Sequence, residues 1–156
     1  MKKIVFALLL SVLIAGVLFL FYLKSNPPLK LESYMTRQDN EAVTIIALDN
    51  KGLRDIQLKQ VLVNDKPPER VELVISKAEP FEVETKLEGN QHISFRKLTQ
   101  VALLPRQYID PKALGQQPQH YAIQVTASHM KKITIQYEYL HIPFTLTAEL
   151  QPAQQD

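Results

Sequence analysis

Cysteine and tryptophan are absent from this sequence of 156 residues, and glycine occurs only four times. The lack of cysteine excludes disulfide-stapled folds, thiolate zinc sites, cysteine nucleophiles and lipidation of an N-terminal cysteine. With so few glycines, neither of the glycine-rich phosphate-binding patterns is present. The hydrophobic content of 46% excludes a disordered chain. The length suits one ordinary domain and little else.

A long uncharged apolar run lies near the N-terminus, over residues 4–23. As a helix it would span about 30 Å, the thickness of the hydrocarbon core of a bilayer. Two lysines precede the run, and three aromatic residues lie near its end, as at a membrane interface. We therefore predict a short head at 1–3 and a single-pass transmembrane signal-anchor helix at 4–23 that binds the lipid bilayer.

A cleaved signal peptide, giving a secreted form, is the alternative to this anchor. We prefer the anchor because the run exceeds the usual apolar core of about 7–15 residues, and no A-x-A-like cleavage site follows it. The charge rule does not orient the helix, because basic residues lie on both sides of it. The short head and long C-terminal part resemble an exported signal-anchor protein. We therefore expect a cell-membrane protein whose C-terminal domain is extracytoplasmic.

The net positive charge of the chain belongs to the anchor and its margins. Lys2, Lys3 and Lys24 lie there, which leaves 15 Lys and Arg against 16 Asp and Glu in the rest. The domain is therefore close to neutral, at −1. Nucleic acid is not an expected partner, because binding to phosphates requires a basic surface.

Beyond the anchor, apolar and polar residues alternate with a period of two. This is the pattern of half-buried strands, in which successive side chains point to opposite faces. Six segments show it clearly: 71–76, 81–88, 93–96, 121–126, 132–139 and 144–150.

Three further segments are less regular. Residues 29–36 are predicted to form an edge strand. The run 43–48 is apolar on both faces, which is typical of a central strand covered on both sides. The run 53–63 changes phase, and a bulge at Lys59-Gln60 would return its apolar residues to one face.

Turn-forming residues separate these segments, which favours an all-β fold. We predict an antiparallel β-sandwich, immunoglobulin-like or fibronectin-like, with about 7–9 strands over residues 29–150. Residues 24–28 contain paired prolines and are predicted to be a stiff spacer. The polar residues 151–156 are predicted to form a tail.

The irregular segment 99–119 interrupts this pattern. It contains a predicted helical turn at 110–115, and we favour its being a crossover between the two sheets. Long irregular loops also often carry function, so Tyr108 is a candidate contact for a partner or ligand. Ile46 and Leu48 are further candidates, because they would form an exposed apolar patch unless the segment 99–118 or another protein covers them.

No motif for catalysis, metal binding or cofactor binding is recognisable. The serines have no G-x-S-x-G or S-x-x-K context, and the histidines have no usual ligand spacing. Solvated histidines are the preferred interpretation of His92, His120, His129 and His141. An exposed, charged strand face is the preferred interpretation of Glu79, Glu82, Glu84 and Glu88. We therefore predict no catalytic, metal-binding or cofactor-binding residues.

One anchor followed by one β-domain is a layout that resembles many small bacterial envelope proteins. We expect a non-catalytic interaction domain whose partner is an envelope protein or a cell-wall component. A receptor for a small ligand or glycan, with a pocket lined by Tyr108, is the alternative. A metal-dependent envelope enzyme is a third hypothesis, which requires two histidines to converge.

Overall fold

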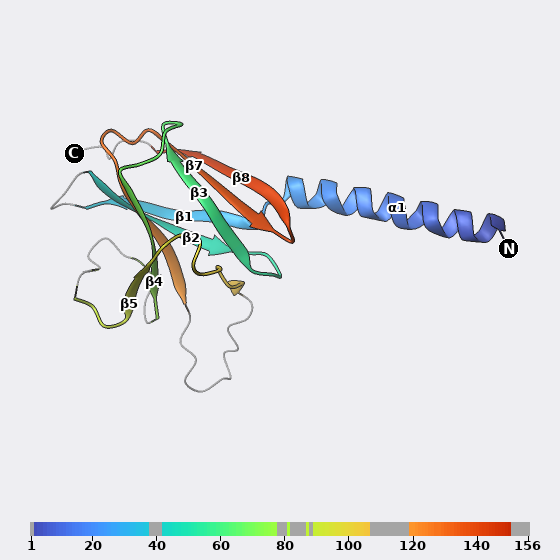
Figure 1. The fold of residues 1–156 in the computed structure, drawn as a ribbon, viewed down its shortest axis with the longest axis horizontal. Helices are drawn as coiled ribbons and strands as arrows, with labels where there is room; N and C mark the ends of the chain where they lie inside the picture. Colours follow the sequence, from blue (N-terminus) through green and yellow to red (C-terminus); the bar gives the residue numbers. More distant parts are fainter. Residues whose placement is uncertain are drawn as a thin grey trace.

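The computed structural model describes residues 2–37, 42–77, 81, 87, 89–106 and 119–150. In these ranges one helix precedes eight strands (Figure 1). Their bounds are α1 Lys2–Ser25, β1 Leu29–Thr36, β2 Val43–Asn50, β3 Ile56–Val63, β4 Arg70–Ser76, β5 Ile93–Arg96, β6 His120–Thr126, β7 Lys132–Tyr139 and β8 Ile142–Glu149.

The strands form two antiparallel sheets. One has five strands in the order β1-β2-β6-β4-β5, and the other has three in the order β3-β7-β8. The predicted β-rich antiparallel fold with one N-terminal apolar helix is confirmed. The segment 29–36 is an edge strand, as predicted, and the segment 43–48 lies between two neighbours within its sheet.

Helix α1 projects from the strands, which leave it uncovered except at Leu23 in its last turn (Figure 1). It is long and apolar enough to cross a membrane. The helix begins at Lys2 and continues to Ser25, so two residues of the predicted spacer are helical. The helix ends before Pro27 and Pro28, which cannot supply the N–H groups that a further turn requires.

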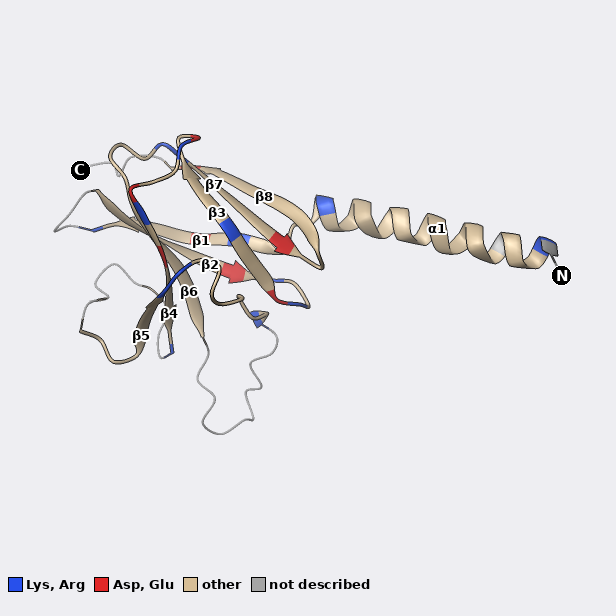
Figure 2. Cartoon of the chain, in the orientation of Figure 1, with Lys and Arg blue, Asp and Glu red and all other residues tan. Residues whose placement is uncertain are grey.

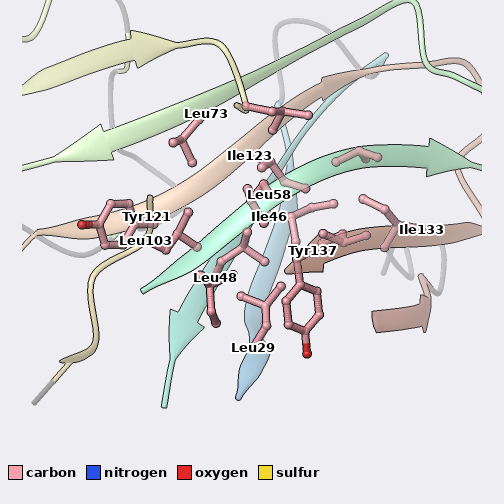
Figure 3. Packing of buried hydrophobic residues seen from close by; sticks show 14 of the residues in the cluster. Leu29, Ile46, Leu48, Leu58, Leu73, Leu103, Tyr121, Ile123, Ile133 and Tyr137 are labelled. Carbon is pink, nitrogen blue, oxygen red and sulfur yellow. The ribbon is translucent and has the colours of Figure 1, made fainter. Parts of the chain in front are cut away.

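The two sheets share one hydrophobic cluster (Figure 3). Strand alternation directs Ile46 of β2, Leu73 of β4 and Ile123 of β6 to the same face, since these residues are paired across the sheet. Ile133 and Tyr137 of β7 meet them from the three-stranded sheet. The core therefore lies between the sheets.

Tyr137 is among the largest fully buried side chains of this cluster. Its ring stacks on Phe144 with centroids 5.5 Å apart. Burial raises the pKa of Tyr137 to about 12, an effect that the neighbouring Leu29 backbone opposes. In the part of the chain that the structure describes, no group bonds the hydroxyl of Tyr137 with good hydrogen-bond geometry.

The predicted bulge in β3 is confirmed. The register of β3 against β7 shifts between Leu58 and Gln60, so one extra residue, Lys59, lies on the β3 side. As a result, two buried residues before the bulge and two after it face the same core. These residues are Ile56, Leu58, Val61 and Val63.

A second cluster covers the opposite face of the five-stranded sheet. Ile45, Val74 and Ala122 pack there with Phe81 and Leu87. Strand β2 is consequently buried along its whole length. Phe81 and Leu87 are the only described residues of the predicted strand 81–88, so that prediction and the acidic face proposed for it lie outside the described residues.

The prediction that residues 99–119 cross from one sheet to the other is wrong. The flanking strands, β5 and β6, both belong to the five-stranded sheet. The described start of this segment instead lies beside the other sheet, where Leu103 and Ile56 exchange two backbone hydrogen bonds of 2.8 and 3.0 Å. Leu103 is fully buried and closes that side of the core. The helical turn predicted at 110–115 lies outside the described residues.

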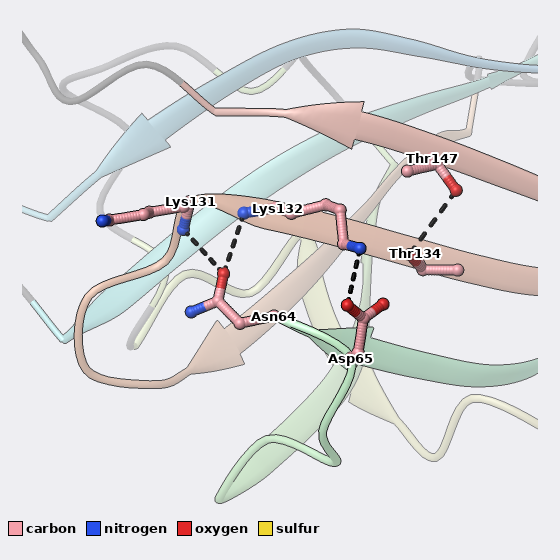
Figure 4. Close-up of polar contacts among 6 residues, drawn as sticks. All are labelled: Asn64, Asp65, Lys131, Lys132, Thr134 and Thr147. Carbon is pink, nitrogen blue, oxygen red and sulfur yellow. Dashed lines mark hydrogen bonds and ion pairs between the residues drawn. The ribbon is translucent and has the colours of Figure 1, made fainter.

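Asn64 joins two connections at the end of the domain remote from α1 (Figure 4). Its side-chain oxygen accepts hydrogen bonds from the backbone N–H groups of Lys131 and Lys132, at 3.1 and 3.0 Å. Its side-chain nitrogen donates to the His129 carbonyl at 2.8 Å. One amide therefore connects the β3–β4 turn to the β6–β7 loop.

Candidate functional site

Ile46 and Leu48, which were candidates for partner contact, are core residues. Their exposed fractions are 0% and 3%, and both belong to the cluster shared by the sheets. The chain itself covers them, through its three-stranded sheet and through Leu103 at the start of the irregular segment. Their assignment as contact residues is therefore corrected. Tyr108 lies outside the described residues.

The histidines are dispersed over the domain. His129 and His141 occupy turn positions with φ of 54° and 61°, as their place in the sequence suggested. His120 begins β6 and is half-buried. Across the described ranges, no three His, Asp or Glu side chains come together in a way that could hold a metal ion.

Several connections converge where α1 meets the domain (Figure 1). The linker 26–28, the β2–β3 loop 51–55 and the β7–β8 turn at Leu140-His141 all lie at this end, which we call the helix-proximal end. β1 starts here and β2 ends here, because the two strands are antiparallel neighbours. The structure of this end therefore determines how the domain is joined to the helix.

The junction between α1 and the β-domain is closely packed. Leu23, in the last turn of α1, is 7% exposed and belongs to the core cluster. Pro28 is buried, and its carbonyl accepts a hydrogen bond of 2.9 Å from the N–H of Lys51. The next residue, Leu29, is fully buried at the start of β1. The linker is thus fixed at both ends.

Asn50 organises the β2–β3 loop. It is 1% exposed, and its side-chain nitrogen donates to the carbonyls of Arg54 and Leu103, at 2.9 and 2.8 Å. Its side-chain oxygen accepts from the N–H of Gly52 at 2.9 Å. An amide can satisfy several backbone groups at once, so this one residue holds the loop and the segment around Leu103 together.

Charged side chains form a cluster at the same end. Arg106 lies 2.9 Å from Asp49 and 3.5 Å from Glu32, measured from Nη1 to the nearest carboxylate oxygen. Asp49 is buried, whereas the side chains of Arg106 and Glu32 are 61% and 51% exposed. The exposed guanidinium has further N–H donors with which it can bind a polar group of a partner.

The charges of this cluster affect the pKa values of Arg106 and of the nearby His120. The hydrogen bond from Arg106 to Asp49, together with the charges of Asp49 and Glu32, raises the pKa of Arg106. Burial lowers the pKa of His120 from its ordinary value of 6.5; the charge of Glu32 opposes this effect, and that of Arg106 adds to it. His120 is therefore biased toward its neutral form.

Sequence reasoning did not identify the charged cluster. Glu32 lies at a register shift in β1, and Arg106 follows an irregular stretch, so neither belongs to a regular pattern. The one signal was Asp49, an acidic residue directly after the apolar run 43–48. Basic residues near the two ends of α1 and the scattered charges of the domain likewise show no motif (Figure 2). The chain matches no known protein family, no curated protein and no solved structure.

Proposed function

We propose that this chain is a membrane-anchored, non-catalytic interaction domain on the extracytoplasmic side of the cell membrane. Its partner in this proposal is an envelope protein or a cell-wall component. The observation that carries the proposal is α1, an apolar helix of membrane-spanning length that the domain leaves uncovered except at Leu23. A helix that is apolar all round requires either a protein core or a lipid environment.

The domain is proposed to be a β-sandwich of the immunoglobulin or fibronectin kind. Two antiparallel sheets that share a core support this interpretation. The chain also passes between the sheets three times, from β2 to β3, from β3 to β4 and from β6 to β7. Such alternation between facing sheets is typical of sandwich folds.

The proposed contact surface is the charged cluster at the helix-proximal end. Arg106 and Glu32 are both accessible, and Arg106 is held in place by a buried carboxylate, Asp49. Preorganised charges favour recognition of polar groups, because less side-chain entropy is lost on binding. The surface would lie close to the membrane, where an envelope partner is within reach.

Anchoring and orientation are tested by protease treatment of intact cells that express the full chain with a C-terminal tag. We expect the tag in the membrane fraction and its loss when protease is added outside. A tag in the medium would mean that the helix is removed. A membrane-bound tag that resists protease until the cells are opened would place the domain in the cytoplasm and refute the orientation.

The contact surface is tested by a photo-crosslinking residue placed at Lys30 in the intact cell, an exposed position that pairs with Asp49 and leaves the charged cluster intact. We expect crosslinks at Lys30 that are lost in an Arg106→Ala variant and kept in a matched Arg70→Ala variant, which breaks a different ion pair, with Glu72. A crosslinker at Lys59, on the three-stranded sheet, is the control position. Equal crosslinking from Lys30 and Lys59 would refute the assignment of the surface.

A further inference from the structure

Few large apolar side chains are exposed in the described part of the β-domain. Leu53 is 65% exposed and Leu140 is 41% exposed, and both lie at the helix-proximal end, in the β2–β3 loop and the β7–β8 turn. The other exposed large apolar side chains in this part of the chain are those of Tyr34 and Leu104. Isolated exposed leucines are common, but this pair lies beside the point where the apolar helix enters.

The β7–β8 turn presents Leu140 in an unfavourable backbone conformation. Tyr139 pairs with Ile142, so the turn has two central residues, Leu140 and His141, with φ of 53° and 61°. Such turns favour Asn-Gly, because other residues pay a steric penalty at positive φ. The β3–β4 turn at the far end has the same form with polar residues at both positions. Of these two turns, only the one at the helix-proximal end places a leucine at positive φ. This strain indicates that the Leu140 side chain has a role there.

The two leucines are held on one rigid unit. The N–H of Leu53 donates to the hydroxyl of Tyr139, the residue before Leu140, at 3.1 Å. Asn50 fixes the rest of the Leu53 loop, and the Pro28 carbonyl binds it to the linker. Because backbone and side-chain hydrogen bonds fix the loop, little conformational entropy would be lost when Leu53 contacts another surface.

Basic residues lie near Leu53 and at the end of α1. Lys51 and Arg54 lie on either side of Leu53 in the loop 51–55 and are exposed, and Lys24 lies in the last turn of α1. Asp55 is the one acidic residue of this loop, and Glu138, two positions before Leu140, is paired with Lys59 at 3.2 Å. Apolar side chains bordered by Lys and Arg suit the bilayer interface, where the cations meet phosphate headgroups and the apolar groups meet acyl chains.

We propose that Leu53 and Leu140 insert into the interface of the bilayer that α1 spans, and that Lys24, Lys51 and Arg54 bind the anionic headgroups. This proposal rests on the proposed membrane anchor. The linker 26–28 can span only about 10 Å even when fully extended, so the helix-proximal end cannot move far from the bilayer surface. The domain would then be held against the membrane surface by its helix-proximal end.

The test uses the absence of cysteine, which allows single-cysteine variants of the full chain to carry an environment-sensitive fluorophore. The labelled sites are Leu53→Cys, Leu140→Cys, Leu13→Cys in the helix and Lys66→Cys in the turn at the far end. The chain is placed in vesicles of phosphatidylcholine and phosphatidylglycerol. Nitroxide lipids quench the label either near the headgroups or deep in the acyl chains.

We expect blue-shifted emission at Leu53 and Leu140 that headgroup-level nitroxide quenches, deep quenching at Leu13, and no quenching at Lys66. Deep quenching at Leu13 with labels at Leu53 and Leu140 that behave like Lys66 would overturn the insertion and leave the anchor intact. No quenching at Leu13 would overturn the anchor and the insertion together. Leu53 does not lie in the strained turn, so its label reports even if Leu140→Cys disturbs the hairpin.

Discussion

Replacement of Gly52 by alanine should destabilise the domain, because the added methyl group has no space. A Cβ at this position would lie 2.8 Å from Cε2 of Tyr139, 2.9 Å from Cβ of Pro28 and 3.0 Å from Oδ1 of Asn50. Each neighbour is buried, and Asn50 is also held by hydrogen bonds. Overpacking of this kind costs about 1–3 kcal/mol. Loss of the bond from the Gly52 N–H to Asn50 would add about 1 kcal/mol.

The expected loss is therefore about 2–4 kcal/mol, a large part of the usual stability of about 5–15 kcal/mol. Chemical denaturation of the full chain in detergent micelles, followed by far-UV circular dichroism, measures it. Gly16→Ala is the matched control, because nothing lies within 4 Å of its Cβ and domain unfolding should not change. A Gly52→Ala variant within about 0.5 kcal/mol of the wild type would refute the close packing of the junction.

The same denaturation assay checks four further predictions. Replacing Leu140-His141 with Asn-Gly should stabilise the domain by about 1 kcal/mol, because it relieves positive φ at two positions; a loss of stability would contradict this. Asn64→Ala should cost about 1–3 kcal/mol through three lost hydrogen bonds, whereas an unchanged midpoint would mean that water replaces them. Tyr137→Phe should raise stability by up to about 1 kcal/mol, because it removes a poorly bonded buried hydroxyl; a clear loss would reveal a partner. Burial lowers the pKa of His120 in the folded state, so the unfolded chain binds the proton more readily. Stability should thus fall as pH drops from above 6.5, and less so in His120→Gln.

The strands could be predicted because the alternation of apolar and polar residues in a strand is a local property of the sequence. Alternation decides which side chains share a face, and the phase change in β3 required an extra residue, which the structure places at Lys59. Coverage of both faces of the run 43–48 could be predicted for the same reason, since an apolar residue at every position cannot face water on either side.

What covers each face could not be predicted, because it depends on pairing between distant segments. Ile46 faces β7 only because β3 and β7 form a separate sheet over it, which no local pattern encodes. The charged cluster has the same origin, since Asp49 and Arg106 are 57 positions apart in the sequence. Their contact follows from the path of an irregular segment past Leu103.

The burial of Leu23 has a mechanical consequence. Because this side chain belongs both to the last turn of α1 and to the core, the helix and the domain are expected to move together rather than about a flexible linker. A membrane-spanning helix tilts to match its apolar length to the thickness of the bilayer. If α1 spans the membrane as proposed, a thinner membrane would incline the whole domain, and the faces that the domain turns toward its surroundings would change with the lipid composition.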